Sequence, residues 1–297
     1  MNNPYLSNCA YSILGCGALS LTYVSSLYVW KTTSRYHRDH PSTVKRRFLS
    51  VLLVALVSPL FVLSFSCSRY GNESQYNLWE LLGLRTAGLL MACTVPLMLT
   101  MILFLGPLAI QKQSGTWMLY SEPMYWINNL KNIHWLRDHI VAPLSEELTF
   151  RACMIPLLVS CFRPHNAVFI CPVFFGVAHI HHIYERLKSG FDLKSALLLS
   201  GFQVLYTTIF GAYSAYLFLR TGHFVAPFIV HAFCNHMGFP DFSEVIKYNE
   251  PKRTLTLGIC VVGLISWCLL LTPLTNPSWY SNNIYWKTEP TLMFCYS

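Results

Sequence analysis

VAPLSEELTFRACMIPLL, residues 141–158, is the stretch of sequence that decides the class of fold. Most of its side chains are apolar, as in a helix that crosses a membrane, yet Glu146, Glu147 and Arg151 stand among them. On insertion scales an Asp, Lys or Arg inside a spanning helix costs about 2.5 to 3.5 kcal/mol, so ionisable residues there are functional by default. This segment therefore predicts both a membrane protein and the location of its functional site.

The rest of the sequence has the composition of a membrane protein. Of its 297 residues 54% are hydrophobic and 11% are charged, whereas ordinary soluble domains carry roughly 25% charged residues. No stretch is left for a separate soluble domain, so we expect a single domain over residues 1–297, with its motif-bearing core in 141–240. The eleven cysteines form no CxxC pair, and we expect most of them to be buried small hydrophobic residues.

The apolar runs predict an all-α fold, a polytopic membrane helical bundle with about eight transmembrane helices. Several runs contain proline, which membrane helices accommodate as kinks. The seventh run is short, so its neighbours must bury it, or it is tilted or re-entrant. The expected spans are 9–30, 48–66, 86–108, 141–162, 166–184, 195–219, 224–238 and 254–273.

The distribution of positive charge predicts the orientation in the membrane. One alternating set of loops holds fifteen Lys and Arg residues and the other set holds five. The positive-inside rule then puts both termini outside the cytosol. The net charge of +8 is explained in the same way, without a nucleic-acid partner. The one N-x-S sequon, Asn72-Glu73-Ser74, falls on the non-cytosolic side. The loops assigned to the cytosol are 31–47, 109–140, 185–194 and 239–253.

Residues 109–140 mix aromatic side chains with asparagine and lysine. Trp126, Leu130 and Ile133 fall at helical spacing on one face, which suits a helix lying in the membrane interface. An aromatic anchor at the membrane surface is favoured there over a substrate groove.

Polar side chains on two other predicted spans reach the same depth as the carboxylates. Phe175 and His179 share a helical face near the cytosolic end of the fifth span, and His231 and Asn235 share one in the seventh. In the fourth span Arg151 follows Glu147 by one helical turn, so these two residues can pair.

That pairing leaves Glu146, about 100° away around the helix, as the candidate base. A carboxylate and an imidazole beside a water molecule can act as general base and orienting partner. Attack of that water on a peptide carbonyl produces an oxyanion, for which His231 and the Asn235 amide are suitable donors. We expect no cofactor. Zinc stays open as an alternative, because Glu146, His179, His182 and His231 are possible ligands, although the chain contains no HExxH motif.

A function in a different class is a transporter or ion-binding bundle, in which buried carboxylates and histidines relay protons. Such proteins often contain inverted repeats, and the two halves of this sequence share no related motif.

Three short motifs on three separate spans resemble those of a known family. They are EExxxR at residues 146–151, FxxxH at 175–179 and HxxxN at 231–235. With them the chain resembles the CAAX prenyl protease 2 family, the Ras-converting endopeptidases within the CPBP group of intramembrane proteases. The motifs cover about residues 141–240, and the flanking spans match only in being apolar.

The resemblance implies an endopeptidase of the endoplasmic reticulum membrane with its active site facing the cytosol. Its partners would be membrane lipid and farnesylated or geranylgeranylated CAAX proteins of the Ras and Rho type, from which it removes the C-terminal aaX tripeptide. It also implies that Glu146 and His179 activate water and that His231 and Asn235 form the oxyanion hole. The supporting residues would be Glu147, Arg151 and Phe175. The alternatives are a zinc-dependent version of this protease and a non-catalytic membrane protein that transports or binds prenylated tails.

Overall fold

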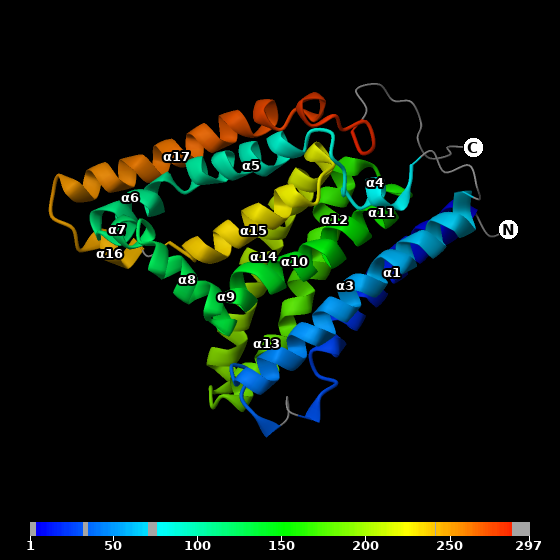
Figure 1. The fold of residues 1–297 in the computed structure, drawn as a ribbon, viewed down its shortest axis with the longest axis horizontal. Helices are drawn as coiled ribbons and strands as arrows, with labels where there is room; N and C mark the ends of the chain where they lie inside the picture. The colour runs from blue at the N-terminus through cyan, green and yellow to red at the C-terminus, as the bar shows by residue number, and fades with distance from the viewer. Residues whose placement is uncertain (1–3, 32–34, 71–75, 241, 287–297) are drawn as a thin grey trace.

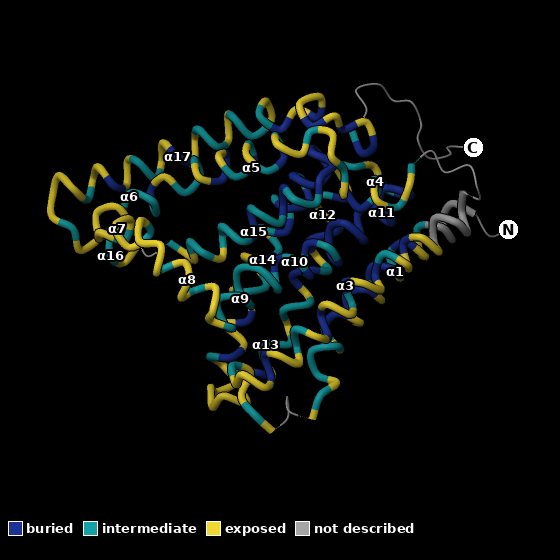
Figure 2. The backbone as a smooth tube through the Cα atoms, in the orientation of Figure 1, coloured by how far each residue is buried: buried dark blue, intermediate teal, exposed yellow. Residues whose placement is uncertain are grey.

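The computed structural model describes residues 4–31, 35–70, 76–240 and 242–286. Every regular element within these ranges is helical, as the sequence predicts (Figure 1). The sequon at Asn72 lies outside the described residues. Buried residues concentrate where the central helices meet, and exposed ones follow the outer faces (Figure 2). Many of those exposed residues are large and apolar, Leu56 and Leu198 among them, which is the surface that a lipid-embedded bundle presents.

Two long helices form one edge of the molecule. Helices α1 (Pro4–Ser26) and α3 (Pro41–Tyr70) lie side by side, and α1 also packs against the central helices (Figure 1). The hydroxyl of Tyr23 in α1 lies 3.0 Å from the Ser145 hydroxyl, next to the carboxylate pair. Helices α1 and α3 therefore support the helix that carries Glu146 and Glu147.

That helix is a continuous run whose pitch changes twice. Helix α9 (Ile133–Leu136) leads into the π-helical turn η2 (Arg137–Val141), and helix α10 (Ala142–Glu147) into a second π-helical turn, η3 (Leu148–Cys153). Helix α11 (Met154–Val159) completes it, and almost every side chain from Thr149 onward is buried. π-Helical turns inside α-helices occur mostly at functional sites.

The centre of the bundle is a closely packed pair of helices. Helix α12 (Pro164–Ala178) continues through the 3-10 turn η4 (His179–His181) into α13 (His182–Lys188), and α14 (Leu193–Thr221) packs along them. A Cβ atom at Gly176 would collide with Oγ1 of Thr208 in α14, so the absence of a side chain permits this approach.

The short seventh span, α15 (Val225–Met237), is covered by its neighbours. It packs against α5 (Leu89–Leu103), α14 and α10, which agrees with the expectation that other helices bury it.

Helix α5 bends by 73° at Phe104 into α6 (Leu105–Gln113), and α17 (Lys252–Leu274) lies along both. The remaining short elements are α4 (Leu78–Leu81), α7 (Thr116–Tyr120), α8 (Pro123–Lys131), α16 (Phe242–Ile246) and η5 (Pro277–Tyr280).

The predicted helix through Trp126, Leu130 and Ile133 is wrong as a single element. Helix α8 ends at Lys131, because Asn132 has an extended backbone, with φ −86° and ψ 114°. The Asn132 side chain accepts hydrogen bonds from the next turn and caps α9. Asparagine at a helix N-cap is favoured for this reason, so the aromatic segment divides into two helices.

The predicted count of eight spans is not confirmed, although helices occupy all eight expected runs. Among the described residues four helices are long and apolar enough to cross a membrane, and the bent pair α5–α6 makes a fifth if it counts as one span. Helix α15 has 13 residues, and the π-helical turns divide the run that carries the glutamates. The chain is nonetheless a multi-pass membrane protein. The four helices are Pro41–Ser64, Pro164–Lys188, Leu193–Thr221 and Lys252–Leu274.

Loops that the charge distribution assigns to one side of the membrane contact one another. Glu185 pairs with Arg47 at 2.7 Å, and Arg137 pairs with Asp39 at 2.7 Å. These two ion pairs join three of the four loops assigned to the cytosol.

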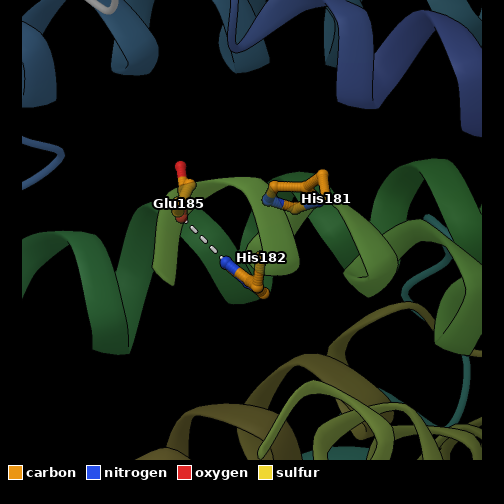
Figure 3. Close-up of side chains that lie close together, drawn as sticks. All are labelled: His181, His182 and Glu185. Carbon is orange, nitrogen blue, oxygen red and sulfur yellow. Dashed lines mark hydrogen bonds and ion pairs between the residues drawn. The ribbon is translucent and has the colours of Figure 1, made fainter. Parts of the chain in front are cut away.

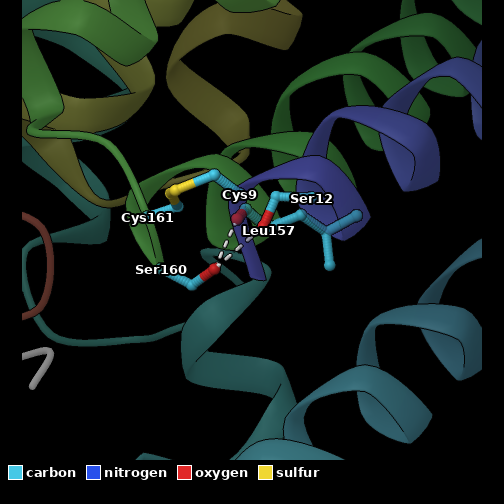
Figure 4. Close-up of a disulfide and its surroundings, with 5 residues drawn as sticks. All are labelled: Cys9, Ser12, Leu157, Ser160 and Cys161. Carbon is cyan, nitrogen blue, oxygen red and sulfur yellow. Dashed lines mark hydrogen bonds between the residues drawn. A yellow bond between two sulfur atoms is a disulfide. The ribbon is translucent and has the colours of Figure 1, made fainter. Parts of the chain in front are cut away.

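The opposite end of the bundle is joined by a disulfide. Cys9 in α1 and Cys161 after α11 are bonded, with their Cα atoms 5.3 Å apart, and the hydroxyls of Ser12 and Ser160 lie 3.3 Å apart beside them (Figure 4). These two cysteines are thus covalently paired. Of the seven free cysteines among the described residues, three are buried, so the expectation that most are buried is wrong; the three are Cys16, Cys153 and Cys171.

Candidate active site

Glu147 is the most enclosed charged residue of the site. Its side chain is fully buried, and its Oε1 accepts hydrogen bonds from Nη1 of Arg151 at 3.0 Å and from Nδ1 of His231 at 2.7 Å. Its Oε2 accepts a third from the hydroxyl of Ser214 in α14 at 2.6 Å. A buried carboxylate requires partners of this kind. The predicted pairing of Glu147 with Arg151 is confirmed, whereas sequence reasoning missed Ser214.

His231 lies between the two glutamates. Because a carboxylate oxygen can only accept, the Nδ1 atom of His231 carries the proton that Glu147 binds. The opposite ring nitrogen, Nε2, is 3.7 Å from Oε2 of Glu146. The Glu146 side chain is 18% exposed while that of Glu147 is not exposed at all. The adjacent carboxylates therefore point in different directions, and the buried one orients the histidine that faces the accessible one.

His179 ends helix α12 with its ring fixed by the backbone. Its Nδ1 atom donates to the carbonyl oxygen of Phe175 at 2.7 Å, because a carbonyl cannot donate. In the neutral imidazole Nε2 then holds the free lone pair, as a base or a water-orienting group needs.

The ring of Phe175 contacts three polar residues of the site. The centre of its buried ring lies 4.7 Å from that of His179, 6.2 Å from that of His231 and 4.2 Å from Cζ of Arg151. An aromatic face close to a guanidinium attracts the positive charge. Phe175 therefore packs both histidines and Arg151 against one apolar surface.

Asn235 occupies a more open position than the other candidates. It is exposed, one helical turn after His231, and its side-chain Nδ2 donates to the carbonyl oxygen of Asp138 in η2 at 2.7 Å. An amide nitrogen has two hydrogens, so one N–H remains for another acceptor. The structure brings the other six predicted residues into one cluster and ties Asn235 to the neighbouring π-helical turn.

Ion pairs beside that turn hold it to the loop before α3. Arg137 donates to Asp138 and to Asp39, both at 2.7 Å. Partial burial raises the pKa of Asp39, but hydrogen bonding from Arg137 and the nearby charge of Arg38 outweigh it. The pKa of this carboxyl is therefore held below its usual value.

A cluster with metal-ligand side chains lies next to this site. Ligand atoms of His181, His182 and Glu185 lie within 4.8 Å of one another, the one such group among the described residues (Figure 3). The carboxylate of Glu185 already binds His182 at 2.8 Å and Arg47 at 2.7 Å. The cluster includes His182, one of the four possible zinc ligands named from the sequence, and the neighbouring His181 adds a further nitrogen.

The arrangement suits hydrolysis by an activated water. An accessible carboxylate faces one imidazole, which a buried carboxylate fixes, and Phe175 packs a second imidazole nearby, so acceptors and donors are positioned before substrate arrives.

The region that holds these residues matches known proteins. A family model described as type II CAAX prenyl endopeptidase Rce1-like matches residues 128–237. The CAAX prenyl protease 2 of Homo sapiens is 44% identical over 281 residues, covering 92% of this chain and 84% of the human protein. That of Arabidopsis thaliana is 33% identical over 92% of both chains. That of Saccharomyces cerevisiae is 30% identical over 76% of this chain and 79% of the yeast protein. No solved structure matches the chain.

Proposed function

The chain belongs to the family of the CAAX prenyl protease 2 enzymes, and on that premise we propose which bond it cleaves and what each residue of the site does. It is a CAAX prenyl endopeptidase, a membrane-embedded hydrolase of peptide bonds. Its substrates are farnesylated or geranylgeranylated CAAX proteins of the Ras and Rho type. The bond that it cleaves follows the prenylated cysteine, and the C-terminal aaX tripeptide leaves.

One observation supports these roles most strongly: Glu146 Oε2 is 3.7 Å from Nε2 of a histidine whose other nitrogen is held by buried Glu147. Glu146 removes a proton from a water molecule, with His179 Nε2 orienting that water. The water oxygen then forms a bond to the carbonyl carbon of the prenylated cysteine.

The tetrahedral intermediate carries its negative charge on the former carbonyl oxygen. His231, as an imidazolium that keeps its Nδ1 proton on Glu147 and carries a second proton on Nε2, donates to this oxyanion together with the second Nδ2 hydrogen of Asn235. The bond from carbon to nitrogen then breaks, and the proton on Glu146 passes to the leaving amine. The first products are the carboxylic acid of the prenylated cysteine and the neutral amine of the tripeptide, and the acid then gives its proton to the amine, so atoms and protons balance.

We propose that this mechanism needs no cofactor, because the residues of the chain supply the base and the oxyanion donors. The zinc-dependent alternative would need His179, His231 and Glu146 as common ligands of one ion. Because Nδ1 of His231 is bonded to Glu147 and Nδ1 of His179 to the backbone of Phe175, each ring would offer Nε2 to the ion, and the chelator experiment below distinguishes the two mechanisms.

We place the enzyme in the endoplasmic reticulum membrane with the active site open to the cytosol. The basic loops contact each other at one end of the bundle, and positive charge marks cytosolic loops. The disulfide between Cys9 and Cys161 lies at the other end, and disulfides persist in the oxidising lumen. Prenylated tails insert into the cytosolic leaflet, which brings the scissile bond to this side.

The test is tripeptide release from a farnesylated CAAX peptide by the purified full-length protein in detergent, with and without a strong zinc chelator. Loss of a general base lowers the rate by about 10² to 10⁴-fold, which is the effect expected for Glu146→Gln. Glu122→Gln is the matched control. It removes an exposed carboxylate at the start of α8, outside the cluster of site residues, and retains the wild-type rate.

Each contrary outcome identifies a different fault. Full activity in Glu146→Gln would refute its role as base, and chelator-sensitive release would favour the zinc enzyme. Binding of the peptide without release by the wild type would favour the non-catalytic alternative.

A further inference from the structure

Arg186 carries a positive charge that no carboxylate neutralises among the described residues. It lies in α13, is partly buried, and donates from Nη1 to the Ser200 hydroxyl at 2.5 Å and from Nη2 to Oε1 of Gln203 at 2.7 Å. Arg47, Arg137 and Arg151 all form ion pairs with acidic side chains, whereas both partners of Arg186 are neutral. The guanidinium is thus fixed in direction and retains hydrogens for an anionic ligand.

The helix that carries Arg186 fixes its distance from the site. Arg186 follows His179 by seven residues along the continuous run of η4 and α13. At about 2.0 Å per residue through the 3-10 turn and about 1.5 Å per residue through α13, this interval spans roughly 12 Å along the axis and a little over two turns, so both side chains project from similar faces.

The neighbouring helix gives the same distance independently. In α14, Gln203 binds Arg186, and Phe210, seven residues later, has its ring 4.8 Å from that of His231. Those seven residues span roughly 10 Å. Along both helices, about two turns or roughly 10 to 12 Å of axial rise therefore separate Arg186 and its partner Gln203 from His179 and from Phe210, which contacts His231.

The leaving group has the same length. An extended chain advances about 3.3 Å per residue, so three residues beyond the scissile bond reach roughly 10 Å. The last of them ends in a free α-carboxylate. Arginine is the side chain best suited to bind a carboxylate, because its planar fork can donate two parallel hydrogen bonds.

We propose that Arg186 binds the C-terminal α-carboxylate of the substrate and so sets the length of the peptide that is released at three residues. The proposal rests on the proposed function, because it concerns the same substrate in the same site. Ser200 and Gln203 hold the guanidinium in place, and Glu146 and His179 act at the other end of the tripeptide.

The test compares kcat/KM of the full-length protein on three farnesylated peptides. They are a CAAX peptide with a free carboxylate, the same peptide with a C-terminal carboxamide, and a peptide one residue longer. A charge-assisted carboxylate contact favours the free acid by about 10- to 100-fold in the wild type. Arg186→Gln brings that ratio close to one, and Arg186→Lys gives an intermediate ratio, since lysine keeps the charge without the fork.

A second variant tests the charge without removing the arginine. Gln203→Glu supplies an internal carboxylate at the same position, so Arg186 is occupied and preference for the free acid falls. Arg163→Gln is the control, because it removes an exposed arginine directly before α12, at the other end of the run that continues into α13, and it keeps the wild-type ratio.

Several results would overturn the proposal. One is a wild-type enzyme that cleaves acid and carboxamide equally well. Another is an Arg186→Gln variant whose rates on both peptides fall by the same factor, which indicates a packing or lipid-binding role. If the wild type cleaved the longer peptide as fast as the CAAX peptide, Arg186 would not set the length of the released peptide. Absence of release from every peptide by the wild type, by contrast, would refute the proposed function itself.

Discussion

At the scale of single residues, Glu147 depends on Arg151 for compensation of its buried charge. Removing one partner of a buried pair costs about 3 to 5 kcal/mol, so we expect Arg151→Met to lower the free energy of unfolding by that amount. The double variant Glu147→Leu with Arg151→Met should regain much of the stability but no activity, because His231 loses the acceptor that orients it. Thermal unfolding in detergent, together with tripeptide release, measures both effects. Wild-type stability of Arg151→Met would contradict this interpretation.

Ser214 provides a milder test of the same carboxylate. Its hydroxyl donates to Oε2 of Glu147, and loss of a hydrogen bond to a charged group is worth about 1.5 to 3 kcal/mol. We expect Ser214→Ala to lower kcat by roughly tenfold or more, if most of that energy serves to orient the site. Thr207→Val on the same helix is the control, since its hydroxyl bonds only to the backbone of α14. Equal effects of the two substitutions would show that Ser214 serves packing alone.

The sequence predicts some of these contacts and cannot predict others. Glu147 and Arg151 are one helical turn apart, so their pairing follows from helical geometry alone. The bonds from Ser214 and His231 to Glu147 join residues 67 and 84 positions apart, and only packing of three helices creates them. A serine in an apolar run has no pattern that distinguishes it from a serine bonded to its own backbone.

At the scale of elements, the close approach of α12 and α14 positions His179 relative to His231. We expect Gly176→Val to force these helices apart, at a cost of about 1 to 3 kcal/mol for overpacking, and to reduce activity further by displacing His179. Gly201→Ala in α14 is the control, because a Cβ atom there meets nothing within 4 Å. Unfolding temperature and kcat should both fall in the first variant and stay near wild type in the second. Normal activity of Gly176→Val would mean that the spacing is not critical.

Element boundaries are less predictable than element existence. Hydrophobic runs locate each helix, because the bilayer requires them. They do not show where a helix bends or changes pitch, as at Phe104 between α5 and α6 or at the extended residue Asn132. Those features depend on local backbone bonding, which the hydrophobic pattern does not record.

At the scale of the whole molecule, the disulfide joins the first helix to the end of the glutamate-bearing run. We expect Cys9 and Cys161 to resist alkylation in intact membranes until a reductant is added. Replacing both by serine should lower stability by about 2 to 4 kcal/mol, the usual worth of a disulfide, while activity persists at low temperature. Mass spectrometry of alkylated peptides gives the first result and thermal unfolding the second. Alkylation of both cysteines without reductant would contradict the bond and the lumenal placement.

The arrangement of charge is the part of the global structure that sequence predicts well. Positive residues identify loops on a common side, and ion pairs join three of these loops in space. Sequence does not predict which acid meets which base, since Arg47 pairs with Glu185 across 138 positions.

The two π-helical turns around α10 have a consequence for how this protein can change during evolution. A π-helical turn contains one residue more than an α-helical turn of similar shape, so each behaves as an insertion that the fold has absorbed. Deleting one residue from η3 would restore the ordinary pitch, so the residues beyond the turn would keep their faces while those inside it would shift by one position. Deletion of Leu148, for example, would place Arg151 three positions after Glu147 in place of four and change the geometry of their ion pair, although every residue type of the site was kept. Descendants of this gene can therefore exchange many side chains in this helix, but a change in its length would alter the geometry of the site.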